Sequence, residues 1–323
     1  MILLGACAAW SLITAAVHDG RPEGVLLAVL ATAAGYAVGR ISGALLPVAA
    51  PGAGAAAGLA LTVLMPDVLP GHGYLAPLGQ AGASAALPAL ATGAACCAAW
   101  STSVPALRLG LRVLAVAVAL TAAAVGSAIG CLASVAVLLC SLAAGSMRHR
   151  GVGIAGLALV AFVTAGAVWA VAAGALPGDP GAALEGRFAP HRLELWQDAL
   201  RLARSAPGLG VGPGRFGELS TTGTRALPDG KPHSAPLQQA SEQGVVGVLL
   251  LAATFCWVLH ALWRTPRPTP VALTAGAALT ALAVIASVGN ALSFTTVTAG
   301  AGLLAGWATA RPWAGEEADG PRL

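Results

Sequence analysis

The sequence predicts an all-α integral membrane protein with about ten transmembrane helices and one long extracytoplasmic loop that carries an amphipathic helix. Apolar residues make up 57% of the 323 residues and charged residues only 9%, and the mean hydropathy is +0.80. A soluble domain carries about 25% charged residues, so this chain has too few polar side chains to cover a soluble fold. A β-barrel, the other structure that spans membranes, would alternate polar and apolar residues.

Ten apolar runs are candidates for membrane-spanning helices, which need about 17–25 residues, with some shorter or tilted. We expect them near residues 2–17, 24–39, 41–65, 84–105, 113–128, 129–147, 151–176, 244–262, 271–289 and 291–309. The third run contains Pro47 and Pro51. Proline removes a backbone hydrogen bond from a helix interior, so we expect a break there.

The arginines orient these helices, because cytoplasmic connections carry an excess of positive charge. Alternate connections hold Arg40, Arg108, Arg112, Arg148, Arg150, Arg264, Arg267 and Arg311. Among the short connections on the other side only Arg21 is basic, and it lies beside Asp19 and Glu23. We therefore expect a multi-pass protein of the cytoplasmic (inner) membrane, embedded in the lipid bilayer, with both termini cytoplasmic.

This topology divides the chain into four parts: 1–176 with about seven helices, an extracytoplasmic loop 177–243, three helices in 244–310, and a cytoplasmic tail 311–323. The loop has 67 residues, seven of them basic and seven acidic. A loop that long without structure of its own is uncommon in a compact protein and is usually functional. We therefore expect the polar chemistry of the protein on its outer face.

An amphipathic helix is predicted within this loop at 191–205. Apolar residues recur at Leu193, Trp196, Leu200 and Ala203 with the spacing of one helical face. Arg192, Asp198, Arg201 and Arg204 occupy much of the remainder. Such a helix would lie on the membrane surface or cap the bundle, with Trp196 at the interface.

A glycine-rich turn follows, in which four Gly and one Pro fall within 208–214, just before Arg215 and Phe216. Glycines permit tight turns and the close approach of a backbone to a ligand. A plain turn that leaves the helix is the alternative interpretation.

Another helix is predicted to begin after His233, because Ser234 suits an N-cap and Pro236 suits the first turn. This helix would run through Gln238 and Glu242, which share a face, into the apolar run from Gly244. His233 would then lie at the positive end of the helix, where an anion is favoured. An imidazole there suits a general base; a solvated loop end is the alternative.

These residues together resemble the O-antigen ligase/polymerase family of bacterial envelope glycan enzymes. That family has an Arg and a Trp four apart, a P-x-x-G-x-G turn and then H-N/S-x-x-L…E-x-G-x-x-G entering a helix. The counterparts here are Arg192 and Trp196; Pro207, Gly210, Gly212 and Phe216; and His233, Ser234, Leu237, Glu242, Gly244 and Gly247. The motifs cover about 187–250, and the flanking helices extend the resemblance more weakly to about 120–310.

The resemblance implies transfer of a glycan, with inversion, from an undecaprenyl (polyprenyl) diphosphate carrier to an acceptor hydroxyl. Neither metal nor cofactor is expected, since the chain has no D-x-D and no Cys/His metal-ligand spacing. His233 would be the general base, with Glu242 as its catalytic partner. The expected donor-binding residues are Arg192, Arg215, Arg187, Gly212 and Gln238.

Two departures from the family pattern keep other functions open. Members of the family often have an S-R-G motif in an earlier helix, but the counterpart here, residues 126–130, reads GSAIG and has no Arg. The family also typically has about twelve helices, whereas ten are predicted here. One alternative is a transporter or flippase-like carrier, which should place ionisable residues inside its spans. The other is a catalytically degenerate member that acts as a scaffold. The net charge of +4 is too diffuse to indicate a nucleic-acid partner.

Overall fold

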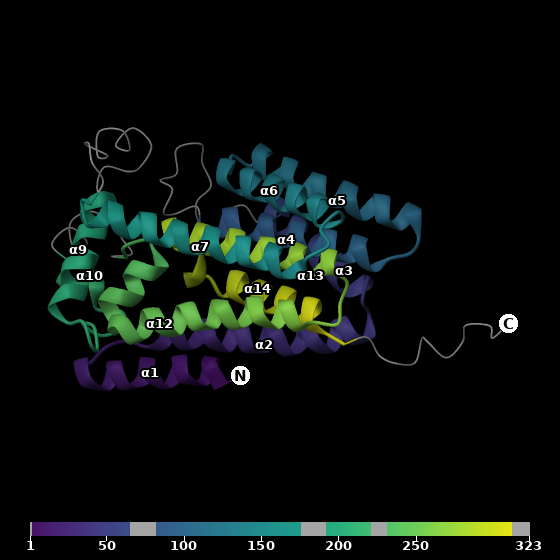
Figure 1. The fold of residues 1–323 in the computed structure, drawn as a ribbon. Helices are drawn as coiled ribbons and strands as arrows, with labels where there is room; N and C mark the ends of the chain where they lie inside the picture. The colour runs from purple at the N-terminus through teal and green to yellow at the C-terminus, as the bar shows by residue number, and fades with distance from the viewer. Residues whose placement is uncertain (1, 65–81, 176–191, 221–230, 312–323) are drawn as a thin grey trace.

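The computed structural model describes residues 2–64, 82–175, 192–220 and 231–311, and these residues form helices joined by turns and short connections (Figure 1). The elements in order are α1 (Ile2–His18), α2 (Glu23–Leu45), α3 (Ala49–Leu64), α4 (Gly82–Ser101), α5 (Pro105–Ala124), α6 (Ala128–Ala144), α7 (Arg150–Ala172), α9 (Arg192–Ser205), α10 (Phe216–Leu219), α12 (Ala235–Arg264), α13 (Thr269–Val288), the 3₁₀ helix η2 (Ala291–Ser293) and α14 (Thr295–Thr309).

Six of the described helices, α2, α4, α5, α7, α12 and α13, are long and apolar enough to cross a membrane. The helices α1, α3 and α6 are apolar but shorter. Each of the ten predicted runs overlaps one of the helices α1 to α7 and α12 to α14. The prediction of an all-α protein embedded in a membrane is therefore confirmed.

Prolines displace several predicted boundaries. The predicted run 41–65 is broken as expected, because α2 continues past Arg40 to Leu45 and α3 begins at Ala49, with Pro47 between them. Pro51 lies in the first turn of α3, where the missing N–H removes no helical hydrogen bond. Likewise α5 begins at Pro105. Arg40, Arg108 and Arg112 therefore lie within helices near their ends, and their predicted place in connections is wrong.

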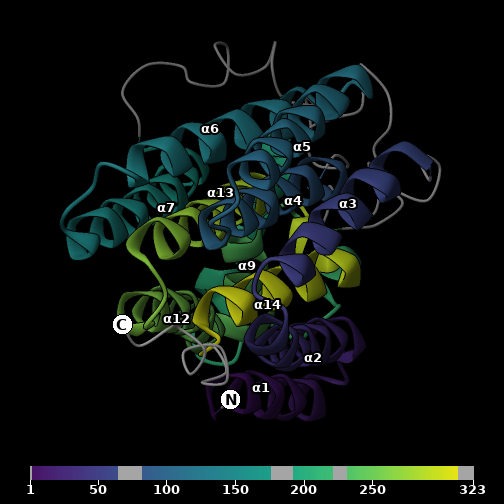
Figure 2. The ribbon, with the colours of Figure 1, turned by 90° about the vertical axis from the view of Figure 1, so that its right-hand side faces the viewer.

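The helix α4 lies at the centre of the bundle, in contact with α3, α5, α6, α13 and α14 (Figure 2). All of its residues from 82 to 99 are buried, and most of them are Ala, Gly, Ser or Cys. Small side chains let neighbouring helices approach closely, which drives helix packing in lipid. The core therefore forms around small residues rather than around large aromatic ones.

Large apolar side chains cover the outside of the bundle. Exposed ones include Leu30, Val38, Leu120, Leu132, Leu139, Leu159, Val163 and Leu249. A soluble monomer rarely exposes contiguous apolar surface on this scale. These side chains are therefore suited to contact lipid tails.

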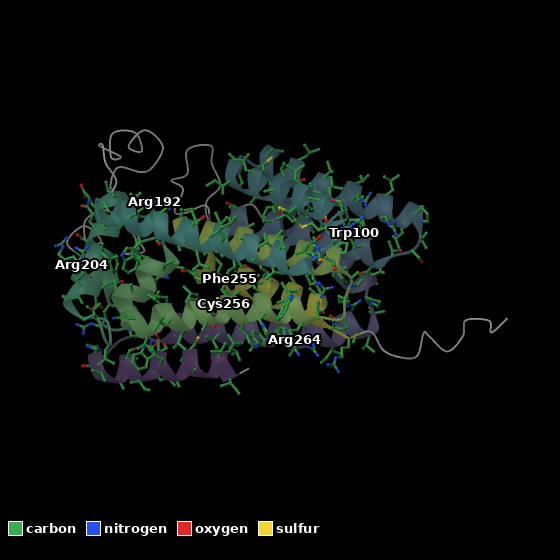
Figure 3. The ribbon with its side chains drawn as sticks, in the orientation of Figure 1. Trp100, Arg192, Arg204, Phe255, Cys256 and Arg264 are labelled. Atoms are coloured by element: carbon green, nitrogen blue, oxygen red, sulfur yellow. The ribbon has the colours of Figure 1, made fainter. Side chains whose placement is uncertain are left out.

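The two ends of the bundle differ in chemistry. At one end Arg267 donates hydrogen bonds to the carbonyls of Gly43 (2.6 Å) and Ala310 (3.0 Å), and Arg150 donates to that of Thr265 (2.7 Å). The ends of α2, α12 and α14 and the start of α7 thus meet there. The helices α9 and α10 lie at the other end (Figure 1). In Figure 3 the labelled Arg192 and Arg204 mark that end, and Arg264 lies far from them.

The contact between α2 and α14 should be sensitive to a single methyl group. A Cβ at Gly302 would lie 2.3 Å from the carbonyl oxygen of Thr32, so Gly302→Ala should lower the free energy of unfolding by about 1–3 kcal/mol. Gly166→Ala in α7 is the control, because nothing lies within 4 Å of its Cβ position. Thermal unfolding in detergent measures both, and equal midpoints for the two variants would contradict this packing.

Candidate functional site

The predicted amphipathic helix is present as α9, and it caps the bundle. Its buried apolar face packs against α7, α10 and α12 through Leu195, Trp196, Ala199 and Leu200. This face is rotated from the predicted one, because Leu193 and Ala203 are only half-buried while Arg192 and Asp198 are buried. Burial of Asp198 is compensated by a hydrogen bond from the hydroxyl of Ser220 (2.7 Å) and by an ion pair with Arg201.

Trp196 connects α9 to the start of α12. Its indole N–H donates to the carbonyl of Pro232 (3.0 Å). The guanidinium of Arg192 lies 5.6 Å from the centre of the Trp196 ring and donates to the carbonyl of Val288, at the end of α13. Burial lowers the pKa of Arg192 to about 10, so this side chain remains charged at neutral pH.

These contacts hold His233 in an unusual conformation. His233 is buried and has a φ of 48°, in the left-handed region. Such a backbone costs about 1–3 kcal/mol and persists only where the surroundings fix it. The carbonyl immediately before it is the one that Trp196 binds. His233 is therefore a buried residue with a constrained backbone at the start of α12, which excludes the solvated loop end. Its role as a base stays a prediction.

The start of α12 agrees with the prediction in position but not in bonding. Ser234 is the N-cap residue and Pro236 lies in the first turn. The Ser234 hydroxyl makes no capping hydrogen bond, and within the described part of the chain this buried oxygen has no hydrogen-bond partner.

A break at Gly244 interrupts α12, where the sequence predicted one continuous helix. Gly244 has φ 68° and ψ −164°, a region that only glycine adopts readily. The backbone groups released by the break are bonded elsewhere. The bonds are Val211 N–H to Ser241 O (2.8 Å), Gly212 N–H to Glu242 O (3.0 Å), Trp10 Nε1–H to Gln243 O (3.0 Å) and Val245 N–H to Pro207 O (2.9 Å).

The glycine-rich turn owes its glycines to this contact. A Cβ at Gly210 would lie 2.4 Å from the carbonyl carbon of Glu242, and a Cβ at Gly212 would lie 2.8 Å from Cβ of His18. The close backbone approach that the sequence suggested is therefore to α12 and to the end of α1. Gly212, a predicted donor-binding residue, contributes its N–H to the carbonyl of Glu242.

Glu242 lies just before the break, outside the membrane-spanning part of α12 that follows Gly244. Its carboxylate accepts hydrogen bonds from Gln238 Nε2 (3.4 Å) and from the backbone N–H of Gly214. The prediction that Gln238 and Glu242 share a face is confirmed. Burial dominates over these bonds and raises the pKa of Glu242 to about 7.

Arg215 belongs to a different set of contacts from Arg192. It precedes α10, donates to the carbonyl of His18 (2.6 Å) and lies 3.7 Å from the carboxylate of Glu218. A third of its side chain is exposed, so Arg215 is open to a ligand while Arg192 is buried. Arg187, the third predicted arginine, lies outside the described residues.

The connection between α1 and α2 also belongs to the end of the bundle that carries α9, which the sequence motifs did not predict. The N–H of Arg21 donates to the carbonyl of Pro213 (2.7 Å), and its side chain lies 3.7 Å from Glu218. A sequence signal existed, since Arg21 is the basic residue among the short connections on this side. In the parts of the chain that the structure describes, no group of three His, Cys, Asp or Glu residues could hold a metal ion.

The pKa of Glu242 makes stability depend on pH. Between about 4.5 and about 7 the folded state keeps a proton that the unfolded state releases, so stability falls as pH rises through this window. The loss should approach about 3 kcal/mol. Glu242→Gln, which cannot ionise, should remove this decline. The measurement is the unfolding midpoint of both proteins at pH 5 and at pH 8. The same change in midpoint for both proteins would show that folding does not raise the pKa of Glu242.

A scan against protein-family models finds no match to this chain, and searches of curated proteins and of solved structures find none either.

Proposed function

We propose that the protein is a membrane glycan ligase or polymerase. It transfers a polyprenyl-diphosphate-linked oligo- or polysaccharide to an acceptor hydroxyl, independently of metal, on the outer face of the cytoplasmic membrane. The observation that carries the proposal is the convergence of motifs that are far apart in sequence. Arg192 and Trp196, the turn at 207–214, His233 and Glu242 meet at one end of an apolar helical bundle.

The proposed topology follows from the two ends of the bundle. All ten helices α1 to α7 and α12 to α14 cross the membrane, and the end with Arg150 and Arg267 faces the cytoplasm, as the excess of positive charge requires. The end with α9 then faces outward. A site at this boundary suits a donor whose polyprenyl chain lies in lipid and whose sugars lie in water.

In the proposed reaction His233 takes the proton of the acceptor hydroxyl. The acceptor oxygen bonds to the anomeric carbon as the bond from that carbon to the diphosphate oxygen breaks, which inverts the centre. Arg215 is the arginine open to the diphosphate, whose two charged oxygens match its planar fork. Arg187 is a further candidate. Arg192 and Glu242 support the geometry from buried positions.

A carrier that moves its substrate across the membrane is the second candidate, and the break in α12 favours it. Transporters use discontinuous helices to line their substrate sites near the midplane. The position of the break counts against a carrier, however, because Gly244 contacts the turn at Pro207 and so lies at one end of the bundle rather than at its middle. The two functions differ in cells that lack the gene: carrier-linked glycan accumulates on the outer face if a ligase is missing and on the cytoplasmic face if a flippase is missing.

His233 should be required for transfer. The His233→Gln variant is expressed from a plasmid in cells that lack the gene. These cells should consume carrier-linked glycan at least ~10²-fold more slowly than cells with the wild-type protein, because glutamine cannot accept the proton. His149→Gln, an exposed histidine at the other end of the bundle, is the control at matched protein level. Full clearance by His233→Gln would favour the scaffold interpretation or a positioning role.

Arg215 should be irreplaceable by lysine, and EDTA should have no effect. Arg215→Lys keeps the charge but loses the bidentate fork, so we expect a rise in KM for the lipid-linked donor of about tenfold. Initial rates with purified protein and extracted donor measure this. Loss of transfer in EDTA, with recovery in Mg²⁺ or Mn²⁺, would refute the metal-independent mechanism.

A further inference from the structure

A groove separates the end of α7 from the exposed face of α9. It has a volume of about 310 Å³ and is lined by Ala172, Ala173, Gly174, Gln197, Leu200, Arg201 and Arg204. Figure 1 shows α9 crossing the end of α7, and Figure 3 labels Arg204 at this end of the molecule. The groove is separate from Trp196 and Arg192, which lie on the buried face of α9.

The charge of the groove is positive. Arg201 and Arg204 line it, and no acidic side chain is among its described lining residues. Asp198, the nearest acid on α9 to Arg201 by sequence, is buried and accepts a hydrogen bond from Ser220. Although Arg201 pairs with Asp198, two thirds of the Arg201 side chain remains exposed. Two guanidinium groups are thus available to an anion at this position.

The surroundings of the groove are those of a lipid. The helix α7 is long and apolar enough to cross a membrane, and it exposes Phe162, Val163 and Trp169 on the way to the groove. Tryptophan concentrates at the level of lipid headgroups, and Trp169 lies one turn before Ala173. The groove is therefore at headgroup depth, with an apolar helix surface leading from it toward the hydrocarbon.

We infer that this groove binds the phosphate of an anionic phospholipid, whose acyl chains lie along α7. Arginine forks bind phosphate oxygens in pairs, and Lys or Arg side chains near a membrane surface attract anionic lipids by about 1 kcal/mol each. A free phosphate would gain nothing from the apolar face of α7, which favours a lipid as the source. This inference goes beyond the proposed glycan transfer and does not depend on it.

The test is lipid retention by the purified full chain, measured by native mass spectrometry with phosphatidylglycerol against phosphatidylethanolamine. Wild type should retain phosphatidylglycerol selectively. Arg204→Gln, which leaves the Arg201–Asp198 pair intact, should weaken retention about 5-fold, and the double variant with Arg201→Gln about 30-fold. Ala173→Phe should also abolish retention, because it fills the groove without changing the charge.

Arg21→Gln is the matched control, since Arg21 is exposed at the same end of the bundle but outside the groove; it should retain the lipid like wild type. Unchanged retention in both Arg204→Gln and Ala173→Phe would overturn the inference. So would equal retention of phosphatidylethanolamine, or displacement of phosphatidylglycerol by equimolar undecaprenyl phosphate, which would assign the groove to the carrier lipid. An unchanged thermal midpoint confirms that each variant is folded.

Discussion

The arrangement of the end of the bundle that carries α9 depends on backbone hydrogen bonds at the break in α12. A buried N–H or carbonyl without a partner costs several kcal/mol near lipid, so a break at the end of a spanning helix needs partners from elsewhere. The turn at 207–214 and the indole of Trp10 supply them. One structural requirement thus connects the loop, α1 and α12, and it explains why glycines are needed on both sides of the contact.

A second contact fixes the start of α12, at the other end of the segment 235–243 from the break. Trp196 holds the carbonyl of Pro232 while Arg192 lies over the indole and bonds to the end of α13. The segment 235–243 is therefore held before its start, at the carbonyl of Pro232, and at its end, at the carbonyls of Ser241, Glu242 and Gln243. These contacts fix the backbone at both ends of this short segment, as the proposed transfer would require of groups that must be held in place before a reaction.

The rest of the bundle provides a rigid base for this end. Small residues around α4 and the close glycine contacts between α2 and α14 bring the helix backbones together, so packing rather than the hydrophobic effect holds the helices in lipid. Arginine side chains bond the carbonyls of several helix ends on the opposite side. Both ends are thereby fixed by backbone contacts, and the loop-bearing end alone carries the convergent motifs.

The sequence by itself determined the class and the local elements. Composition excluded a soluble fold, apolar runs located the helices, and the spacing of Gln238 and Glu242 placed both on one face, because these properties depend on residues within a few turns of one another. Only the tertiary structure decided the break at Gly244, the burial of Arg192 and the bond from Trp196. Trp10 bonds to a carbonyl 233 residues away and Trp196 to one 36 residues away. Hydropathy and local periodicity carry no information about partners at such separations, and a broken helix is stable only where those partners exist.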